Sequence, residues 1–125
     1  MNAESEESLV LVVDDNLDAA EVLALLIEVE GFAAATARTI SEARESVVQR
    51  RPRLILLDLN LPDGNGMSLL AELKNDLHTS GIEVVMVSGM VDDRVREEAH
   101  LLGASAFVTK PMNHAQLVGL LETVR

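Results

Sequence analysis

The sequence contains no cysteine, no tryptophan and no tyrosine. Without cysteine, the chain can form no disulfide bond, thiolate metal site or cysteine nucleophile, and it suits a reducing compartment. Phe32 and Phe107 are the whole aromatic content, so the core must be built from aliphatic residues and methionine. No apolar run approaches the roughly 20 residues of a membrane-spanning helix. We therefore expect a cytoplasmic protein with no membrane partner.

Basic residues are also scarce, because 10 Lys and Arg stand against 21 Asp and Glu and give a net charge of −11. This balance argues against direct binding of nucleic acid, since little would neutralise the phosphates. The net charge fits a cation site, a basic protein partner or simple solubility equally well. The acidic, polar residues 1–8 lack the basic start of a signal peptide, and we expect them to form a flexible tail. Residues 9–125 are expected to form one domain.

Five apolar segments alternate with five segments of helical periodicity. Apolar or β-branched runs predict strands at residues 9–13, 32–36, 54–58, 82–87 and 106–108. Helices are predicted at residues 16–30, 39–51, 66–76, 92–102 and 113–124. Short connections between alternating strands and helices predict an α/β fold, a (βα)5 doubly wound parallel sheet with helices on both faces.

Local signals support the helix ends. Thr39 and Glu42, and Asn113 and Gln116, have the spacing of capping boxes. Gly31 and Gly103 stand where helices commonly stop. In the first helix the apolar positions at helical spacing are Ala19, Val22, Leu23, Leu26 and Ile27.

Polar side chains follow four of the predicted strands, namely Asp14 with Asp15, then Asp58, Ser88 and Lys110. Taken alone, Asp58 could be the start of a loop, and the acids at 14 and 15 could be favoured by a helix dipole. In a doubly wound sheet, however, the carboxyl ends of the strands meet at one edge, where such folds bind ligands. The common position at strand ends favours a single functional site.

The chemistry of this set points to phosphoryl transfer. Three carboxylates in a partly dry pocket repel one another unless a cation is present, and Mg²⁺ prefers oxygen ligands of this kind. Lys110 supplies a fixed positive charge, and the Ser88 hydroxyl can donate to an oxyanion. Such groups position and stabilise a transferred phosphoryl group, with Asp58 as the nucleophile that forms an acyl phosphate.

Four motifs resemble a known family: LVVDD at 11–15, LDLNLPDGNG at 57–66, VSG at 87–89 and GASAFVTKP at 103–111. In order, spacing and strand context they closely resemble receiver domains of two-component response regulators, which have the CheY-like, flavodoxin-like fold. The resemblance covers residues 9–125 and implies the strand order 2-1-3-4-5. It also implies a protein that is not an enzyme with an external substrate and that assists only its own phosphorylation and dephosphorylation.

The resemblance implies a role for each site residue. Asp58 would be the phosphoacceptor, and Ser88 and Lys110 would contact the phosphoryl oxygens. Mg²⁺ would be bound by Asp15, by Asp58 and by the backbone carbonyl of Asn60. Asp14 would act on the same ion through water.

Further roles concern signal output. Phe107 matches the switch aromatic of the family, although it could also be ordinary core filler. Asn60 and Met90 flank the expected path of hydrolytic water and are expected to tune the lifetime of the phosphoryl group. The bond between Lys110 and Pro111 is expected to be cis.

The expected partners are proteins. A histidine kinase or phosphotransfer protein would act upstream, and residues 90–125 would contact a protein effector. Leu17 and Leu25, off the core face of the first helix, are a hypothetical docking site for the upstream partner. The chain would be a monomer or a weak dimer. It could be a stand-alone receiver, or a fragment of a longer regulator or hybrid kinase.

Three other classes share parts of the pattern. A flavodoxin-type FMN carrier should have a phosphate-binding loop after the first strand, where Asp14 and Asp15 would instead repel phosphate. A haloacid-dehalogenase-like phosphatase needs a second acid two residues after its nucleophile, and Asn60 occupies that position. A pseudo-receiver scaffold would have lost part of the site, whereas every expected group is present here.

Overall fold

The structure is a computed structural model that describes residues 8–90 and 92–125. The predicted tail at residues 1–8 thus lies almost wholly outside the described residues. Ser8, its last residue, accepts a hydrogen bond through its carbonyl from the N–H of Ala33 at 2.9 Å.

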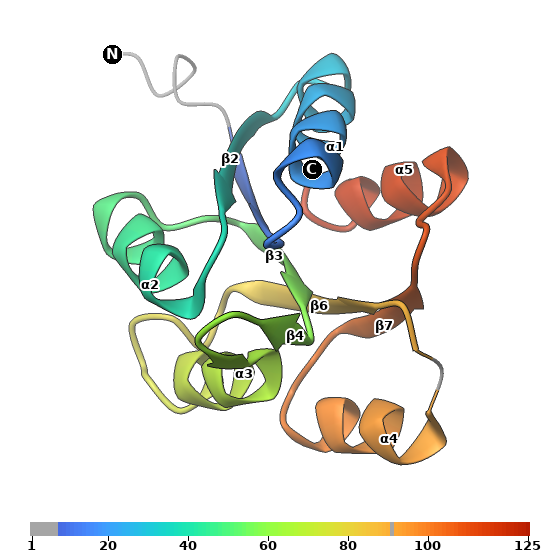
Figure 1. Ribbon diagram of the computed structural model, residues 1–125. Helices are drawn as coiled ribbons and strands as arrows, with labels where there is room; N and C mark the ends of the chain where they lie inside the picture. The colour runs from blue at the N-terminus through green and yellow to red at the C-terminus, as the bar shows by residue number, and fades with distance from the viewer. Residues whose placement is uncertain (1–7, 91) are drawn as a thin grey trace.

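Five strands form one parallel sheet (Figure 1). The strands are β1 (Leu9–Val13), β2 (Ala33–Ala37), β3 (Leu54–Asp58), β6 (Glu83–Ser88) and β7 (Ala106–Thr109). Their order is β2-β1-β3-β6-β7, and every neighbouring pair is parallel. The predicted (βα)5 fold and its 2-1-3-4-5 strand order are confirmed.

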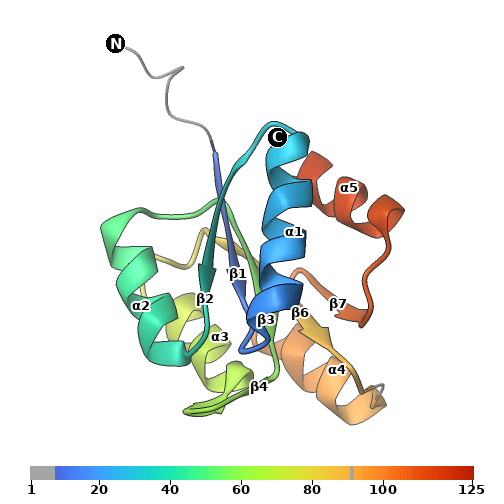
Figure 2. The same ribbon diagram turned by 45° about the horizontal axis from the view of Figure 1, so that its top comes forward.

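The helices lie on both faces of the sheet (Figures 1 and 2). They are α1 (Leu17–Val29), α2 (Ile40–Gln49), α3 (Gly66–Lys74), α4 (Asp93–Leu101) and α5 (His114–Glu122). One core cluster lies between the sheet and α2, α3 and α4, and a second lies beneath α1 and α5. Successive residues of a central strand enter opposite clusters, as Ile55 and Leu56 do. Because the sheet is covered on both sides, its strands are continuously apolar rather than alternating.

The predicted helix caps are present with one change of partner. Thr39 Oγ1 accepts a hydrogen bond from the N–H of Glu42 at 3.0 Å, but the Glu42 carboxylate accepts from Arg38 instead of Thr39. Asn113 and Gln116 form both bonds of their capping box. Gly31 and Gly103 follow their helices with positive φ angles of 96° and 106°.

The core face of α1 is narrower than its apolar spacing predicts. Ala20 and Ile27 are buried, but Val22 is 57% exposed and Ala19 is also exposed. Helical spacing groups Ala19 and Val22 with the buried positions, but both are exposed, because α1 borders a cavity on this side and both residues line it. Leu17 and Leu25, predicted to lie off the core face, are 39% and 63% exposed.

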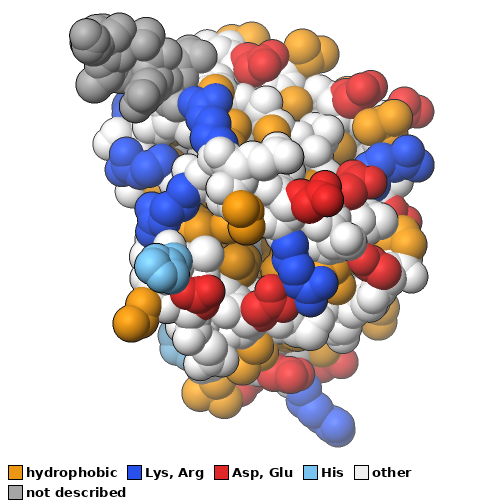
Figure 3. Space-filling model, turned by 90° about the vertical axis from the view of Figure 1, so that its left-hand side faces the viewer, with side chains coloured by type: hydrophobic (Ala, Val, Ile, Leu, Met, Phe, Trp, Pro, Cys, Tyr) orange, Lys and Arg blue, Asp and Glu red, His pale blue; other side chains and the backbone are white. Residues whose placement is uncertain are grey.

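Acidic and basic side chains are mixed on the surface. On the side of the molecule that carries α2, Figure 3 shows both signs interspersed with scattered hydrophobic side chains. The net negative charge is therefore not gathered into one acidic patch on this side. Among the described residues, none of the helices has the length and hydrophobicity to cross a membrane.

Candidate functional site

Two buried carboxylates emerge at the same edge of the sheet. Asp58 is the last residue of β3, and Asp14 directly follows the adjacent strand β1, where Val13 pairs with Leu57. Asp58 and Asp14 are only 8% and 4% exposed. Burying a carboxylate is costly unless it is paired, so each needs a partner at this edge.

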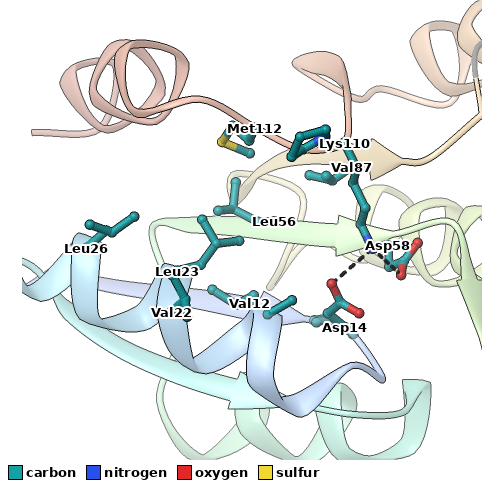
Figure 4. A pocket seen from close by; sticks show the side chains of 13 residues that line it. Val12, Asp14, Val22, Leu23, Leu26, Leu56, Asp58, Val87, Lys110 and Met112 are labelled. Carbon is teal, nitrogen blue, oxygen red and sulfur yellow. Dashed lines mark hydrogen bonds and ion pairs between the residues drawn. The ribbon is translucent and has the colours of Figure 1, made fainter.

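Lys110 is the partner of both. Its Nζ atom lies 2.9 Å from Oδ2 of Asp58 and 3.0 Å from Oδ2 of Asp14 (Figure 4). Partial burial by itself lowers the pKa of Lys110, but the hydrogen bonds and charges of Asp58 and Asp14 outweigh this and raise that pKa above its usual value. The side chain is therefore a protonated cation at neutral pH.

The second oxygens of the two carboxylates face backbone amides. Oδ1 of Asp14 accepts from the N–H of Asn16 at 2.9 Å, and Oδ1 of Asp58 accepts a longer bond of 3.3 Å from the N–H of Asn60. Asp15 is exposed beside them. Ligand oxygens of Asp14, Asp15 and Asp58 lie within 4.8 Å of one another, which suits a hard divalent cation with oxygen ligands.

Ser88 reaches the same edge from the other side of β3. It ends β6, one residue past the Val87 that pairs with Asp58, and it is 1% exposed. Its Oγ accepts a hydrogen bond from the N–H of Met90 at 3.2 Å. Its carbonyl accepts from the N–H of Lys110 at 2.8 Å, so the backbones that carry Ser88 and Lys110 are joined. The bond between Lys110 and Pro111 is cis.

The segment after Asp58 folds back on it as a small hairpin, β4 (Asn60–Leu61) with β5 (Gly64–Asn65). Gly66 donates its N–H to the carbonyl of Leu59 at 2.6 Å, and a Cβ at position 66 would collide with the carbonyl oxygen of Asp58. Glycine is required at 66 because the returning backbone passes so close to Asp58.

The remaining predicted residues lie around this centre. Asn60 and Met90 are exposed, and residue 91 is outside the described part of the chain. Phe107 lies three residues before Lys110 and packs against the core cluster of α2, α3 and α4. The guanidinium carbon of Arg96, on α4, lies 5.3 Å from the centre of its ring, a cation–π contact that the sequence did not reveal.

An apolar cavity of about 350 Å³ adjoins the carboxylates, between α1 and the segment after β7 (Figure 4). Asp14, Asp58 and Lys110 line one end, and the rest is apolar, including Val12, Leu23, Leu26, Leu56 and Met112. Sequence reasoning missed this cavity. In the sequence, the cavity was signalled only by the apolar residues that α1 carries outside its buried face.

The chain matches the family model described as response regulator receiver domain over residues 10–122. It is 32% identical to the phosphate regulon transcriptional regulatory protein PhoB of Pseudomonas aeruginosa, over 92% of this chain and 50% of PhoB. It is 37% identical to the DNA-binding response regulator MtrA of Mycolicibacterium smegmatis, over 87% of this chain and 46% of MtrA. The chain thus spans about half the length of these curated relatives.

A solved structure shows the same architecture at higher coverage. The receiver domain of NtrX from Brucella abortus has a TM-score of 0.83 and 32% identity, with 92% of this chain and 96% of that one covered.

Because PhoB and MtrA are named as transcriptional and DNA-binding regulators, the relatives give no support to the expectation that nucleic acid is not a partner. The family match spans nearly all of the fold and includes the whole carboxylate edge, and we conclude that the chain belongs to the response regulator receiver domain family of two-component systems.

Proposed function

We propose that this chain accepts a phosphoryl group on Asp58 from a phosphohistidine of a histidine kinase or phosphotransfer protein. The observation that carries the proposal is the pairing of one lysine, Lys110, with two buried carboxylates at the carboxyl edge of the sheet. The receiver family consists of signalling domains rather than enzymes that turn over an external substrate. The modified residue itself is then the signal.

In the proposed reaction a carboxylate oxygen of Asp58 attacks the phosphorus atom. The new O–P bond forms as the P–N bond to the donor imidazole breaks, and the imidazole leaves with the bonding electron pair. Lys110 is placed to balance negative charge on the phosphoryl oxygens. Ser88 can turn its hydroxyl proton toward one of them, because among the described residues its Oγ accepts from Met90 and donates to no acceptor.

Receiver domains generally bind Mg²⁺ at a cluster of aspartates, and Asp14, Asp15 and Asp58 form such a cluster. We propose that Asp15, Asp58 and the backbone carbonyl of Asn60 hold the ion, with Asp14 acting through water. When bound, the ion would offset the charge of the phosphoryl oxygens. The donor set fits a hard cation, since all of these ligands are oxygens.

Phosphorylation would shift the population between two arrangements of the segment after Ser88 and of α4. Ser88 gains a charge-assisted hydrogen bond in one of them, and Phe107 is the proposed reporter on the output side. Its contact with Arg96 links β7 to α4, within the proposed effector surface at residues 90–125. Asn60 and Met90, both exposed near the site, are the proposed tuners of phosphoryl lifetime.

The test is incubation with acetyl phosphate and Mg²⁺, followed by intact mass measurement. The wild-type chain should gain one phosphoryl group, and Asp58→Asn should gain none. An unmodified wild-type chain under every donor tried would instead favour an interaction scaffold. Continuous release of phosphate from many substrates would favour a phosphatase.

A second candidate concerns the whole protein, because relatives of about twice this length are named as transcriptional or DNA-binding regulators. In this alternative the chain is the receiver part of a longer regulator. An antibody raised against residues 9–125 would decide it, by showing in a lysate of the source cells whether the native protein is larger than the 13.5 kDa of this chain.

A further inference from the structure

Asp63 joins the hairpin after Asp58 to a helix from another part of the chain. It stands between β4 and β5, and its side chain reaches the first residues of α2. Oδ1 accepts a hydrogen bond from the N–H of Ile40 at 2.8 Å, and Oδ2 accepts from the N–H of Ser41 at 3.1 Å. The two segments are 22 and 23 residues apart along the chain at these contacts.

These bonds give α2 a second cap. Thr39 satisfies the N–H of Glu42, whereas Asp63 satisfies two further N–H groups that have no partner within the helix. The hydrogen bond from Ile40 and that from Ser41 lower the pKa of Asp63, although partial desolvation opposes them, and the charge of Arg44 adds to the lowering. The carboxylate is therefore ionised at neutral pH, the form that accepts both bonds.

The hairpin is held at its base as well as at its tip. Leu59 and Leu61 are buried in the core cluster of α2, α3 and α4. At the tip, Gly64 faces Ile40, whose Cδ1 atom would lie 3.1 Å from a Cβ at position 64. Asn60, between the two buried leucines, pairs with Asn65 across the hairpin. A two-stranded hairpin has little stability of its own, so its conformation depends on these attachments.

We infer that Asp63 is a positioning residue that fixes the backbone carbonyl of Asn60 by tying the hairpin to α2. The inference rests on the proposed function, in which that carbonyl is a Mg²⁺ ligand. Without the hydrogen bonds of Asp63, the peptide at residue 60 is still held by the buried side chains of Leu59 and Leu61. The tip of the hairpin can then move, and its movement changes the orientation of the Asn60 carbonyl. Loss of a group that orients a metal ligand typically weakens metal binding by about 10- to 100-fold.

Thr39 offers a matched control, because its side chain caps the same helix and, among the described residues, makes no hydrogen bond to the hairpin; its Oγ1 accepts from the N–H of Glu42. The backbone amide signals of wild type, Asp63→Ala, Asp63→Asn and Thr39→Ala would be followed by NMR while MgCl₂ is added at constant ionic strength. Asp63→Ala should raise the Mg²⁺ dissociation constant about tenfold. Asp63→Asn keeps one acceptor oxygen, so its Mg²⁺ dissociation constant should lie between those of Asp63→Ala and wild type. Thr39→Ala should keep the wild-type constant.

A second readout separates positioning from lost stability. The rate of phosphorylation by acetyl phosphate is measured against Mg²⁺ concentration for the same variants. Asp63→Ala should need about tenfold more Mg²⁺ for half-maximal rate and reach the wild-type rate at saturation. Because Mg²⁺ that binds only the folded state would also rescue a partly unfolded variant, circular dichroism without Mg²⁺ must show that Asp63→Ala is fully folded under the assay conditions.

The inference is overturned if Asp63→Ala and Asp63→Asn bind Mg²⁺ like wild type, or if Thr39→Ala weakens binding as much as they do. In either case Asp63 is only a helix cap. Failure of the proposed function looks different, because the wild-type chain itself would then neither bind Mg²⁺ nor gain a phosphoryl group. If Asp63→Ala does not fold, the comparison of Asp63→Asn with Thr39→Ala decides.

Discussion

Lys110 Nζ lies 2.9 Å from Oδ2 of Asp58, the shorter of the two bonds that this ammonium makes to buried carboxylates. The contact joins the segment after β7 to the end of β3 across the intervening strand β6. Removing one partner of a buried pair leaves the other charge uncompensated, which costs more than the pair contributes. Lys110 is therefore placed to affect both the stability and the reactivity of this edge.

Replacing Lys110 by methionine should slow phosphorylation of Asp58 by acetyl phosphate about 100-fold, since one preorganised charge on the phosphoryl oxygens is lost. The rate would be measured by intact mass over time at saturating Mg²⁺. Lys110→Arg keeps the charge but not the compact ammonium, so its phosphorylation rate should lie between those of Lys110→Met and wild type. A wild-type rate in Lys110→Met would remove Lys110 from the proposed mechanism.

Leu25→Asp should impair phosphoryl transfer from the kinase at least tenfold while leaving transfer from acetyl phosphate unchanged. Leu25 is 63% exposed on α1, so its replacement should change the free energy of unfolding by less than about 0.5 kcal/mol. Leu17→Asp should behave in the same way.

Val48→Asp is the control for this docking prediction, because Val48 is 86% exposed on α2, on the opposite face of the sheet. It should transfer from both donors at the wild-type rate. Equal losses in Leu25→Asp and Val48→Asp would show a general effect of added charge rather than docking through α1.

Phe107→Ala should leave the phosphorylation rate near wild type and weaken the response of α4. Phe107 is half-buried, so the stability loss should be smaller than the roughly 3–5 kcal/mol of a fully buried phenylalanine. NMR of the backbone amides of α4 before and after addition of acetyl phosphate and Mg²⁺ measures the response. Shifts in α4 as large as those of wild type would identify Phe107 as core filler.

The substitution Asp63→Asn should make the free energy of unfolding depend less on pH in the acid range. The pKa of Asp63 is lowered from its ordinary value of 3.8, chiefly by the hydrogen bond from Ile40. A carboxyl whose pKa is lowered by folding contributes stability that is complete above the unfolded pKa and is lost as pH falls through the folded one. Urea unfolding of both proteins between pH 7 and pH 3 should therefore show wild type more stable at neutral pH and the difference shrinking in acid. A pH-independent difference would contradict the assignment.

The sequence was enough to predict the sheet and the position of the site's main groups. Continuous apolar runs identified the strands, because both faces of the sheet are covered. Polar residues at the ends of these runs pointed to Asp14, Asp58 and Lys110 as members of the site. Interactions between distant segments could not be predicted in this way. The bonds from Ile40 and Ser41 to Asp63 join residues more than 20 positions apart, and no local periodicity encodes such a contact.

The burial of side chains on α1 was the second feature that the sequence could not predict. Helical spacing locates the apolar stripe of a helix but not its buried width, which depends on how closely neighbouring elements pack. Val22 fits the stripe and is nevertheless exposed, because the cavity toward Met112 separates α1 from the segment after β7.

The two bonds of Lys110 close loops of very different length, since its partners lie 52 and 96 positions away along the chain. The reactive centre therefore exists only while the whole sheet is assembled, and unfolding disperses it into ordinary solvated side chains. Under the proposed function, the amount of acyl phosphate formed in a short pulse of donor would count the folded molecules. In a denaturant series such a pulse would serve as a chemical probe of folding in a chain that has no tryptophan or tyrosine to give a fluorescence signal.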